Sequence, residues 1–203
     1  MTARASLVNA IAVAVALAGA GGCIASDPGA HAVSAAQLDA SWLRAAPTPV
    51  VVQRGDRDCG AAALAMVGGA WGHPWTLDDV EQRIPPGADG IQLAAMRDFA
   101  RAAGLDAYAI RGTRADLEHE LAAGRPVLLG LVLPVDRKHN RSHYEVAVAL
   151  HPSDGDVVTI DPATGRMQER QSKVFDLEWK TAGYATLVVV AAKPTASKEG
   201  QKP

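Results

Sequence analysis

Hydrophobic positions in the first half of this chain recur mainly at helical spacing. Small apolar residues follow Cys59 on every face, which predicts a buried helix that Gly68 and Gly69 bring to an end. A capping sequence at Thr76 begins the next helix. Residues 91–103 carry an apolar stripe that a glycine closes. The helices predicted in this way cover residues 59–67, 76–85, 91–103 and 113–123.

Strand patterns dominate the second half. Residues 127–132 form a continuous apolar run, which is typical of a central strand buried on both faces. The predicted strands cover residues 106–110, 127–132, 143–150, 156–160 and 183–191. Because helices mostly precede strands, the pattern predicts an α+β fold in which N-terminal helices pack on a mainly antiparallel sheet.

The N-terminus has the features of an export signal. Arg4 precedes an apolar run at residues 7–18, and small residues then lead to Cys23, as in a bacterial lipoprotein signal. The run is shorter than the roughly 20 residues that a membrane-spanning helix needs. We therefore expect cleavage before Cys23 and a lipid on its sulfur, with ordinary cleavage near Gly22 as the alternative. Ile24, in place of an aspartate that would favour inner-membrane retention, predicts the outer membrane, with the domain facing the periplasm.

Composition predicts how the chain is divided into parts and which classes of partner it excludes. The expected parts are a signal peptide at 1–22, a tether at 23–47, one domain at 48–192 and a disordered tail at 193–203. The 20 basic and 22 acidic residues give a net charge of −2, and the sequence has neither a basic stripe nor a glycine-rich phosphate loop. We therefore expect no nucleic acid or nucleotide partner. With Cys23 lipidated, Cys59 is the lone thiol, which suits an oxidising compartment.

The surroundings of Cys59 favour a nucleophile. Asp58 is a candidate N-cap, and a thiol at a helix start has its pKa lowered from about 8.5. Gln53, six residues upstream, supplies a carboxamide donor for an oxyanion. His143 and Asp161 follow as a base and the group that orients it. The alternative is a buried structural cysteine, since free cysteine is among the most buried residue types.

A second carboxylate competes with Asp161 for the orienting role. Glu145 lies two residues after His143 on a predicted strand, so the two side chains share a face. Asp161 is the preferred candidate because it precedes Pro162 at a strand end, where the turn fixes its position.

Three segments together resemble the C39 peptidases, papain-like cysteine peptidases best known as processing domains of bacteriocin exporters that cut leader peptides after Gly-Gly. The segments are residues 53–66, 142–150 and 159–162, and the resemblance extends over about 48–192, including a closing segment at 175–190. It implies a papain-like fold and a peptide or protein substrate, with no cofactor. It also implies that an exporter or secretion system is a partner of this stand-alone lipoprotein.

Carried over by position, the resemblance makes Cys59 the nucleophile, His143 the base, Asp161 its orienter and Gln53 the oxyanion donor. Glu145 departs from the family pattern, because it interrupts a strand that is usually wholly apolar. Two other functions use the same residues or the same shape. One is a non-hydrolytic peptide-binding or assembly module, and the other is an acyl transferase that passes the acyl group to an amine or thiol.

The remaining histidines have simpler explanations. His139 and His143 are four residues apart, but in a polar loop instead of a helix, so we expect no metal site. His73 belongs to an aromatic turn, with substrate contact as the alternative, and His119 is expected to be solvated. The loop at 134–142 either lines the substrate groove or is a solvated hairpin.

Overall fold

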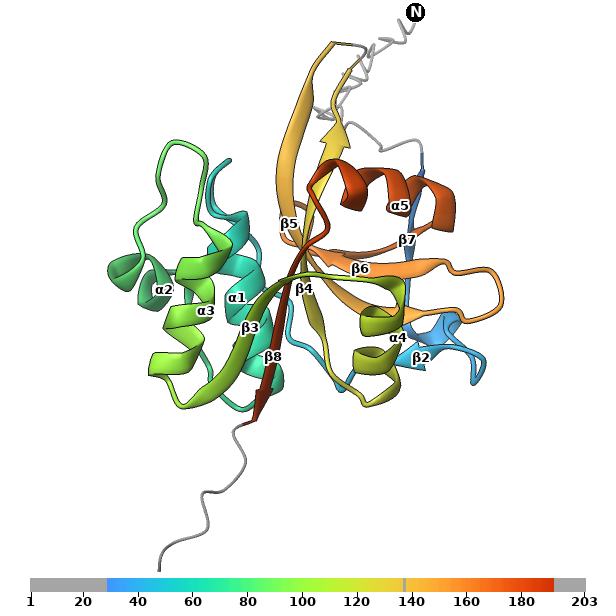
Figure 1. Cartoon of the computed structure of the whole chain (residues 1–203), viewed down its shortest axis with the longest axis horizontal. Coiled ribbons are helices and arrows are strands. Elements are labelled where there is room, and N and C mark those ends of the chain that lie inside the picture. Colours follow the sequence, from blue (N-terminus) through green and yellow to red (C-terminus); the bar gives the residue numbers. More distant parts are fainter. Residues whose placement is uncertain (1–28, 137, 192–203) are drawn as a thin grey trace, which may run out of the picture.

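The computed structural model of the chain describes residues 29–136 and 138–191. Three helices form one side of the molecule, and a sheet with two further helices forms the other (Figure 1). This confirms the predicted α+β fold. The predicted signal peptide at 1–22, the lipid-attachment residue Cys23 and the tail at 193–203 lie outside the described residues.

The three grouped helices are α1 (Cys59–Ala70), α2 (Leu77–Arg83) and α3 (Leu93–Ala102). Their positions confirm the helices predicted from the apolar pattern. At the start of α2, the Thr76 hydroxyl accepts a hydrogen bond from the Asp79 N–H, and the Asp79 carboxylate accepts one from the Thr76 N–H. This reciprocal cap satisfies two backbone donors that the first turn would otherwise leave unpaired.

The end predicted for α1 was wrong. The helix continues through Gly68 and Gly69 to Ala70, and the following Gly72 has the positive φ, +80°. A Cβ on Gly68 would lie 2.1 Å from the Trp75 ring, and one on Gly69 would lie 2.3 Å from Pro49. These glycines therefore allow close packing inside the helix and do not terminate it.

The eight strands in the described part of the chain belong to one antiparallel sheet. They are β1 (Ala30–Val33), β2 (Leu43–Arg44), β3 (Leu105–Arg111), β4 (Val127–Pro134), β5 (Asn140–Leu150), β6 (Val157–Asp161), β7 (Arg166–Arg170) and β8 (Ala185–Ala191). Their order is β1-β7-β6-β5-β4-β8-β3, and β2 pairs with the end of β5. The long β4–β5 hairpin extends beyond the other strands (Figure 1).

Five elements were not among those predicted. β1 and β2 fall in the stretch assigned to the tether, where they pair with β7 and β5. A short 3-10 helix, Ala35–Gln37, lies between them. β7 carries mostly polar residues, and α5 (Ser172–Thr181) follows it directly. The other helix on this side, α4 (Arg114–Ala122), was predicted.

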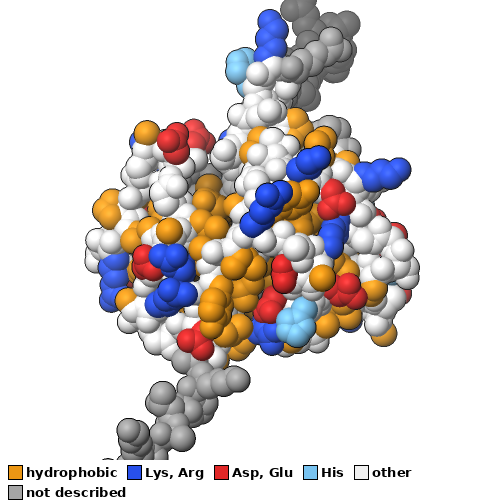
Figure 2. Space-filling model, viewed as in Figure 1, with side chains coloured by type: hydrophobic (Ala, Val, Ile, Leu, Met, Phe, Trp, Pro, Cys, Tyr) orange, Lys and Arg blue, Asp and Glu red, His pale blue; other side chains and the backbone are white. Residues whose placement is uncertain are grey.

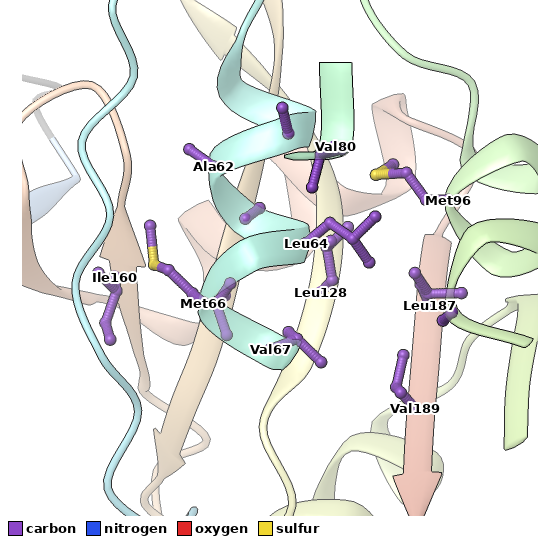
Figure 3. Packing of buried hydrophobic residues seen from close by; sticks show 14 of the residues in the cluster. Ala62, Leu64, Met66, Val67, Val80, Met96, Leu128, Ile160, Leu187 and Val189 are labelled. Atoms are coloured by element: carbon purple, nitrogen blue, oxygen red, sulfur yellow. The ribbon is translucent and has the colours of Figure 1, made fainter. Parts of the chain in front are cut away.

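Two hydrophobic clusters occupy opposite faces of the sheet. One joins α1, α2 and α3 to one face, where α1 side chains such as Leu64 and Met66 pack near Leu128 and Ile160 (Figure 3). The other joins α4 and α5 to the opposite face through Leu129, among others. Neighbouring residues of β4 therefore belong to different cores, as strand geometry requires.

The sheet ends at β3, whose outer face is partly apolar. Figure 2 shows hydrophobic side chains gathered along this strand, where Tyr108 is 49% and Ile110 is 37% exposed. Among the described residues, no helix combines the length and hydropathy needed to cross a membrane.

Candidate active site

The first residue of α1 meets β5 at the junction of the two halves of the molecule. Cys59 is 6% exposed, and its sulfur accepts hydrogen bonds from the backbone N–H groups of Gly60 and Tyr144. Asp58 occupies the N-cap position as predicted, but its side chain does not cap the helix. Its carboxylate instead accepts a hydrogen bond from the Gly55 N–H at 3.0 Å. The first-turn N–H of Gly60 is thereby left to the sulfur.

His143 lies between Cys59 and Asp161, as the sequence predicted. Its side chain hydrogen-bonds with Cys59, and its Nε2 lies 2.7 Å from Asp161 Oδ1. Because Asp161 takes Nε2, Nδ1 is the ring nitrogen left to face the thiol. His143 is 3% exposed and Asp161 is 5% exposed, so water hardly screens these contacts.

Asp161 ends β6 and is fixed by the turn that follows. Its carboxylate also accepts hydrogen bonds from the Ala163 N–H at 2.8 Å, the Thr164 hydroxyl at 2.9 Å and the Gln168 amide at 2.9 Å. Burial alone would raise the pKa of Asp161, but its hydrogen bond to His143, the charge on His143 and these donors together lower it. Asp161 is therefore a carboxylate with little freedom to move.

Cys59 and His143 each stabilise the charged form of the other. Burial would raise the pKa of Cys59, but the hydrogen bond and charge of His143 outweigh it and lower that pKa. Burial would likewise lower the pKa of His143, yet hydrogen bonds to Asp161 and Cys59 and the charge of Glu145 raise it to about 9. The combination favours a thiolate–imidazolium pair at neutral pH.

Gln53 is tied to the same end of β6. Its backbone N–H donates to the Pro162 carbonyl at 2.9 Å, which holds its segment beside the residue that follows Asp161. Its side-chain Nε2 donates to the Gly55 carbonyl at 2.7 Å. A carboxamide has two N–H donors, and this hydrogen bond uses one of them. The Oε1 atom is buried and has no hydrogen-bond partner among the described residues.

Both candidate carboxylates approach the same imidazole nitrogen. Asp161 Oδ1 lies at 2.7 Å from His143 Nε2, whereas Glu145 Oε1 lies at 3.9 Å. Glu145 is engaged elsewhere: Oε1 accepts from Arg170 Nη2 at 2.7 Å, and Oε2 accepts from the Thr159 hydroxyl at 2.5 Å. The geometry therefore supports Asp161 as the hydrogen-bond partner of His143. Glu145 lies farther from the ring and is bound to Arg170 and Thr159 instead.

Sequence reasoning missed Arg170 and Glu178, which complete this buried cluster, and the Tyr144 N–H, which reaches the sulfur. A charged residue inside an apolar strand, Glu145, was the one signal of a buried partner. Neither its identity nor its position was readable, since Arg170 lies 25 residues away on another strand.

One group of three potential metal ligands occurs among the described residues: His143, Glu145 and Asp161, with ligand atoms within 4.8 Å. The guanidinium of Arg170 already pairs with Glu145 there, which opposes a further cation. His139 lies apart from this group, on the exposed hairpin, with its Nδ1 2.7 Å from Asp136.

The other histidines match their simpler explanations. The ring of His73 packs against that of Trp75, with centroids 5.2 Å apart, and His119 is exposed. Residues 134–136 and 138–142 of the predicted loop are exposed and lie at the end of the β4–β5 hairpin.

The fold and the paired Cys59 and His143 define a cysteine peptidase of papain-like architecture. The model of the Peptidase C39 family matches residues 47–193, so the chain belongs to that family. It is 28% identical over 139 residues to the pediocin PA-1 transport/processing ATP-binding protein PedD of Pediococcus acidilactici, which covers 68% of this chain and 18% of PedD. The chain thus spans about a fifth of that relative.

Solved structures share the fold at low identity. The peptidase domain of Streptococcus ComA, a bifunctional ABC transporter of a quorum-sensing pathway, matches with a TM-score of 0.58 and 18% identity over 72% of this chain and 100% of its own. A double-glycine-motif protease from an AMS/PCAT transporter, solved in complex with the leader peptide, matches with a TM-score of 0.57 and 22% identity. This match covers 73% of this chain and 95% of that structure. A putative C39-like peptidase from Bacillus anthracis matches with a TM-score of 0.60 and 16% identity, over 72% of this chain and 96% of that structure.

Proposed function

We propose that Cys59, His143 and Asp161 are the catalytic triad of this peptidase and that Gln53 assists as an oxyanion donor. The observation that carries the proposal is the position of His143, which hydrogen-bonds to the thiol with one edge and to the Asp161 carboxylate, at 2.7 Å, with the other. A nucleophile, a base and a group that orients the base are the three parts that acyl transfer by a thiol requires.

The reaction follows from this geometry. The Cys59 thiolate attacks the peptide carbonyl carbon, and the negative charge moves to the carbonyl oxygen, which accepts from the Gln53 amide and a backbone N–H. The imidazolium of His143 then donates its proton to the departing amine as the C–N bond breaks. His143, now neutral, takes a proton from water, the resulting hydroxide attacks the thioester, and Cys59 leaves as the thiolate.

For the substrate, we propose peptides with a leader that ends in a Gly-Gly pair. Membership of the C39 family supports this, as does the likeness to a double-glycine-motif protease solved with a leader peptide. A peptide exporter or secretion system would then be the partner that supplies or removes the peptide, in keeping with the transport/processing function in the name of PedD.

The proposal is tested with synthetic leader peptides that carry Gly-Gly or Ala-Ala before the cleavage point, followed by mass spectrometry. We expect cleavage after Gly-Gly by the wild type and none by Cys59→Ala, with equal circular dichroism. Product carrying an added amine in place of water would identify an acyl transferase. If wild type and Cys59→Ala both bind the peptides equally and cut none, the protein is a binding module and the peptidase proposal fails.

We also propose that the chain is exported and anchored through a lipid on Cys23, in the outer membrane on the periplasmic side. The basis is the arrangement of Arg4, the apolar run at 7–18 and the small residues before Cys23. Mass spectrometry of the mature N-terminus decides this point. A diacylglyceryl Cys23 is expected, and an unmodified N-terminus or cleavage at another residue would contradict it.

A further inference from the structure

A network of three charged side chains is buried directly behind His143. Glu145 on β5 is 0% exposed, Arg170 at the end of β7 is 1% exposed and Glu178 on α5 is 3% exposed. Arg170 Nη2 donates to Glu145 at 2.7 Å, while its Nη1 donates to Glu178 at 2.9 Å. Buried ions are costly unless each is paired and hydrogen-bonded, so a network of this kind needs a reason.

The network touches the proposed catalytic histidine through one atom. Glu145 Oε1, the oxygen that binds Arg170 Nη2, lies 3.9 Å from His143 Nε2. Glu145 Oε2 is held by the Thr159 hydroxyl and, at 3.3 Å, by Arg170 Nε. The carboxylate is thereby fixed on both oxygens, at a distance too long for a hydrogen bond to the imidazole but short for a charge interaction.

We propose that Glu145 is a positioning residue of the peptidase reaction, whose negative charge keeps His143 protonated until the leaving amine takes its proton. Arg170 cancels this charge only in part, because it is shared with Glu178. This inference rests on the proposed function, since the imidazolium is the form that pairs with the thiolate and later acts as the acid.

The other charged groups around His143 do not make the charge of Glu145 redundant. Cys59 faces the ring from α1, Asp161 faces it from β6, and Glu145 faces it from its own strand. Asp161 accepts three further hydrogen bonds, which divide its carboxylate among four donors. The charge of Glu145 is among the causes that raise the pKa of His143 to about 9. An opposite charge within about 4–6 Å is close enough to shift a pKa by one to three units.

The test uses two isosteric variants that remove one charge each and keep one carbonyl oxygen that can accept a hydrogen bond from Arg170. We expect Glu145→Gln to move the alkaline limb of the kcat/KM profile down by about one pH unit. The factor by which Glu145→Gln lowers kcat/KM should then be roughly fivefold greater at pH 9 than at pH 7. Glu178→Gln should move the limb in the same direction by less, because Arg170 then neutralises Glu145 more completely.

A second readout does not depend on any substrate. The NMR resonance of the His143 ring, assigned by its loss in His143→Ala, should titrate at lower pH in Glu145→Gln than in the wild type. Failure to cut any peptide combined with this shift would sink the proposed function and leave the electrostatic role of Glu145 standing. Normal peptide cleavage with no shift in the His143 titration would support the proposed function and refute the electrostatic role of Glu145.

A matched ion pair away from the site supplies the control. Glu120 is 8% exposed and binds Arg125 at 2.5 and 2.9 Å, on the α4 side of the protein. Glu120→Gln should leave the alkaline limb and the His143 titration where they are. If Glu145→Gln lowers activity equally at every pH and His143 titrates as in the wild type, the network is only structural and the inference is overturned.

Discussion

Removing the Cys59 thiol should make the stability of this protein fall more steeply with rising pH than that of the wild type, in which the Cys59–His143 pair adds little pH dependence. In the unfolded chain, His143 loses its proton near pH 6.5 and Cys59 near pH 9.0. In the folded protein the pKa of His143 is about 9 and that of Cys59 is lowered. Between these limits the folded pair holds one proton as imidazolium, and the unfolded pair holds one as thiol. Equal proton counts give no pH dependence of stability.

Cys59→Ala removes this balance. Asp161 and Glu145 still favour a protonated His143 in the folded state, whereas the unfolded histidine titrates near 6.5. A raised pKa in the folded state means that the stabilisation is complete below pH 6.5 and is lost as pH rises through the folded pKa. The slope is about 1.4 kcal/mol per pH unit. Over the interval from 6.5 to about 9 this slope sets an upper limit of roughly 3–4 kcal/mol, because Cys59 itself contributes to that pKa.

Urea unfolding under reducing conditions, at half-unit steps from pH 6 to 9.5, measures this effect. The difference in unfolding free energy between wild type and Cys59→Ala should widen with pH, since other groups cancel in the comparison. Cys59→Ala combined with His143→Ala should restore a profile parallel to the wild type. If wild type and Cys59→Ala stay parallel within about 0.5 kcal/mol, the extrapolation error of the method, the thiolate–imidazolium pair does not exist.

Three further outcomes follow from the site and from α1. Gln53→Ala should slow peptide turnover by roughly 10² to 10³, the usual cost of one oxyanion donor, while iodoacetamide alkylation of Cys59 keeps its wild-type pH profile. Asp161→Asn should move that alkylation profile to higher pH, because a less basic His143 supports the thiolate less; an unchanged profile would mean that Glu145 suffices. Gly68→Ala should lower the unfolding free energy by about 1–3 kcal/mol, since its Cβ would lie 2.1 Å from Trp75. Gly55→Ala, whose Cβ meets nothing closer than 3.6 Å, is the control, and equal losses in urea unfolding would refute the packing argument.

The apolar pattern predicted the elements that are apolar throughout or along one stripe. α1, β4 and β8 are buried on all faces, α3 buries one stripe, and each lies near the position that the pattern predicted. β7 was missed because it is largely polar: hydrogen bonding to β6 and β1 holds it in the sheet, and long-range pairing leaves no local signal. α5 was missed because Glu178 faces inward beside Phe175 and Trp179, which breaks the apolar stripe.

The candidate site was predictable where chemistry fixes a residue type in advance. A thiol, an imidazole and a carboxylate in this order, together with the family resemblance, suggested Cys59, His143 and Asp161, and the structure brings the three side chains together. The choice between Asp161 and Glu145 was not decidable from spacing, because both reach the same nitrogen and differ by only 1.2 Å in distance, 2.7 against 3.9 Å. That difference in distance depends on the register of β5 with β6 and on the hydrogen bonds by which Arg170 fixes the Glu145 carboxylate.

The charges of the site act unequally on its two reacting groups. Asp161, Glu145 and Glu178 exceed the positive charges of His143 and Arg170, and an excess of acid normally opposes a thiolate. Here Asp161 and Glu145 approach Nε2, on the edge of the imidazole away from the sulfur. The pKa of Cys59 is governed by burial, by His143 and by two backbone N–H groups. The acids therefore strengthen the imidazolium more than they repel the thiolate, and the ring of His143 is what separates the two effects.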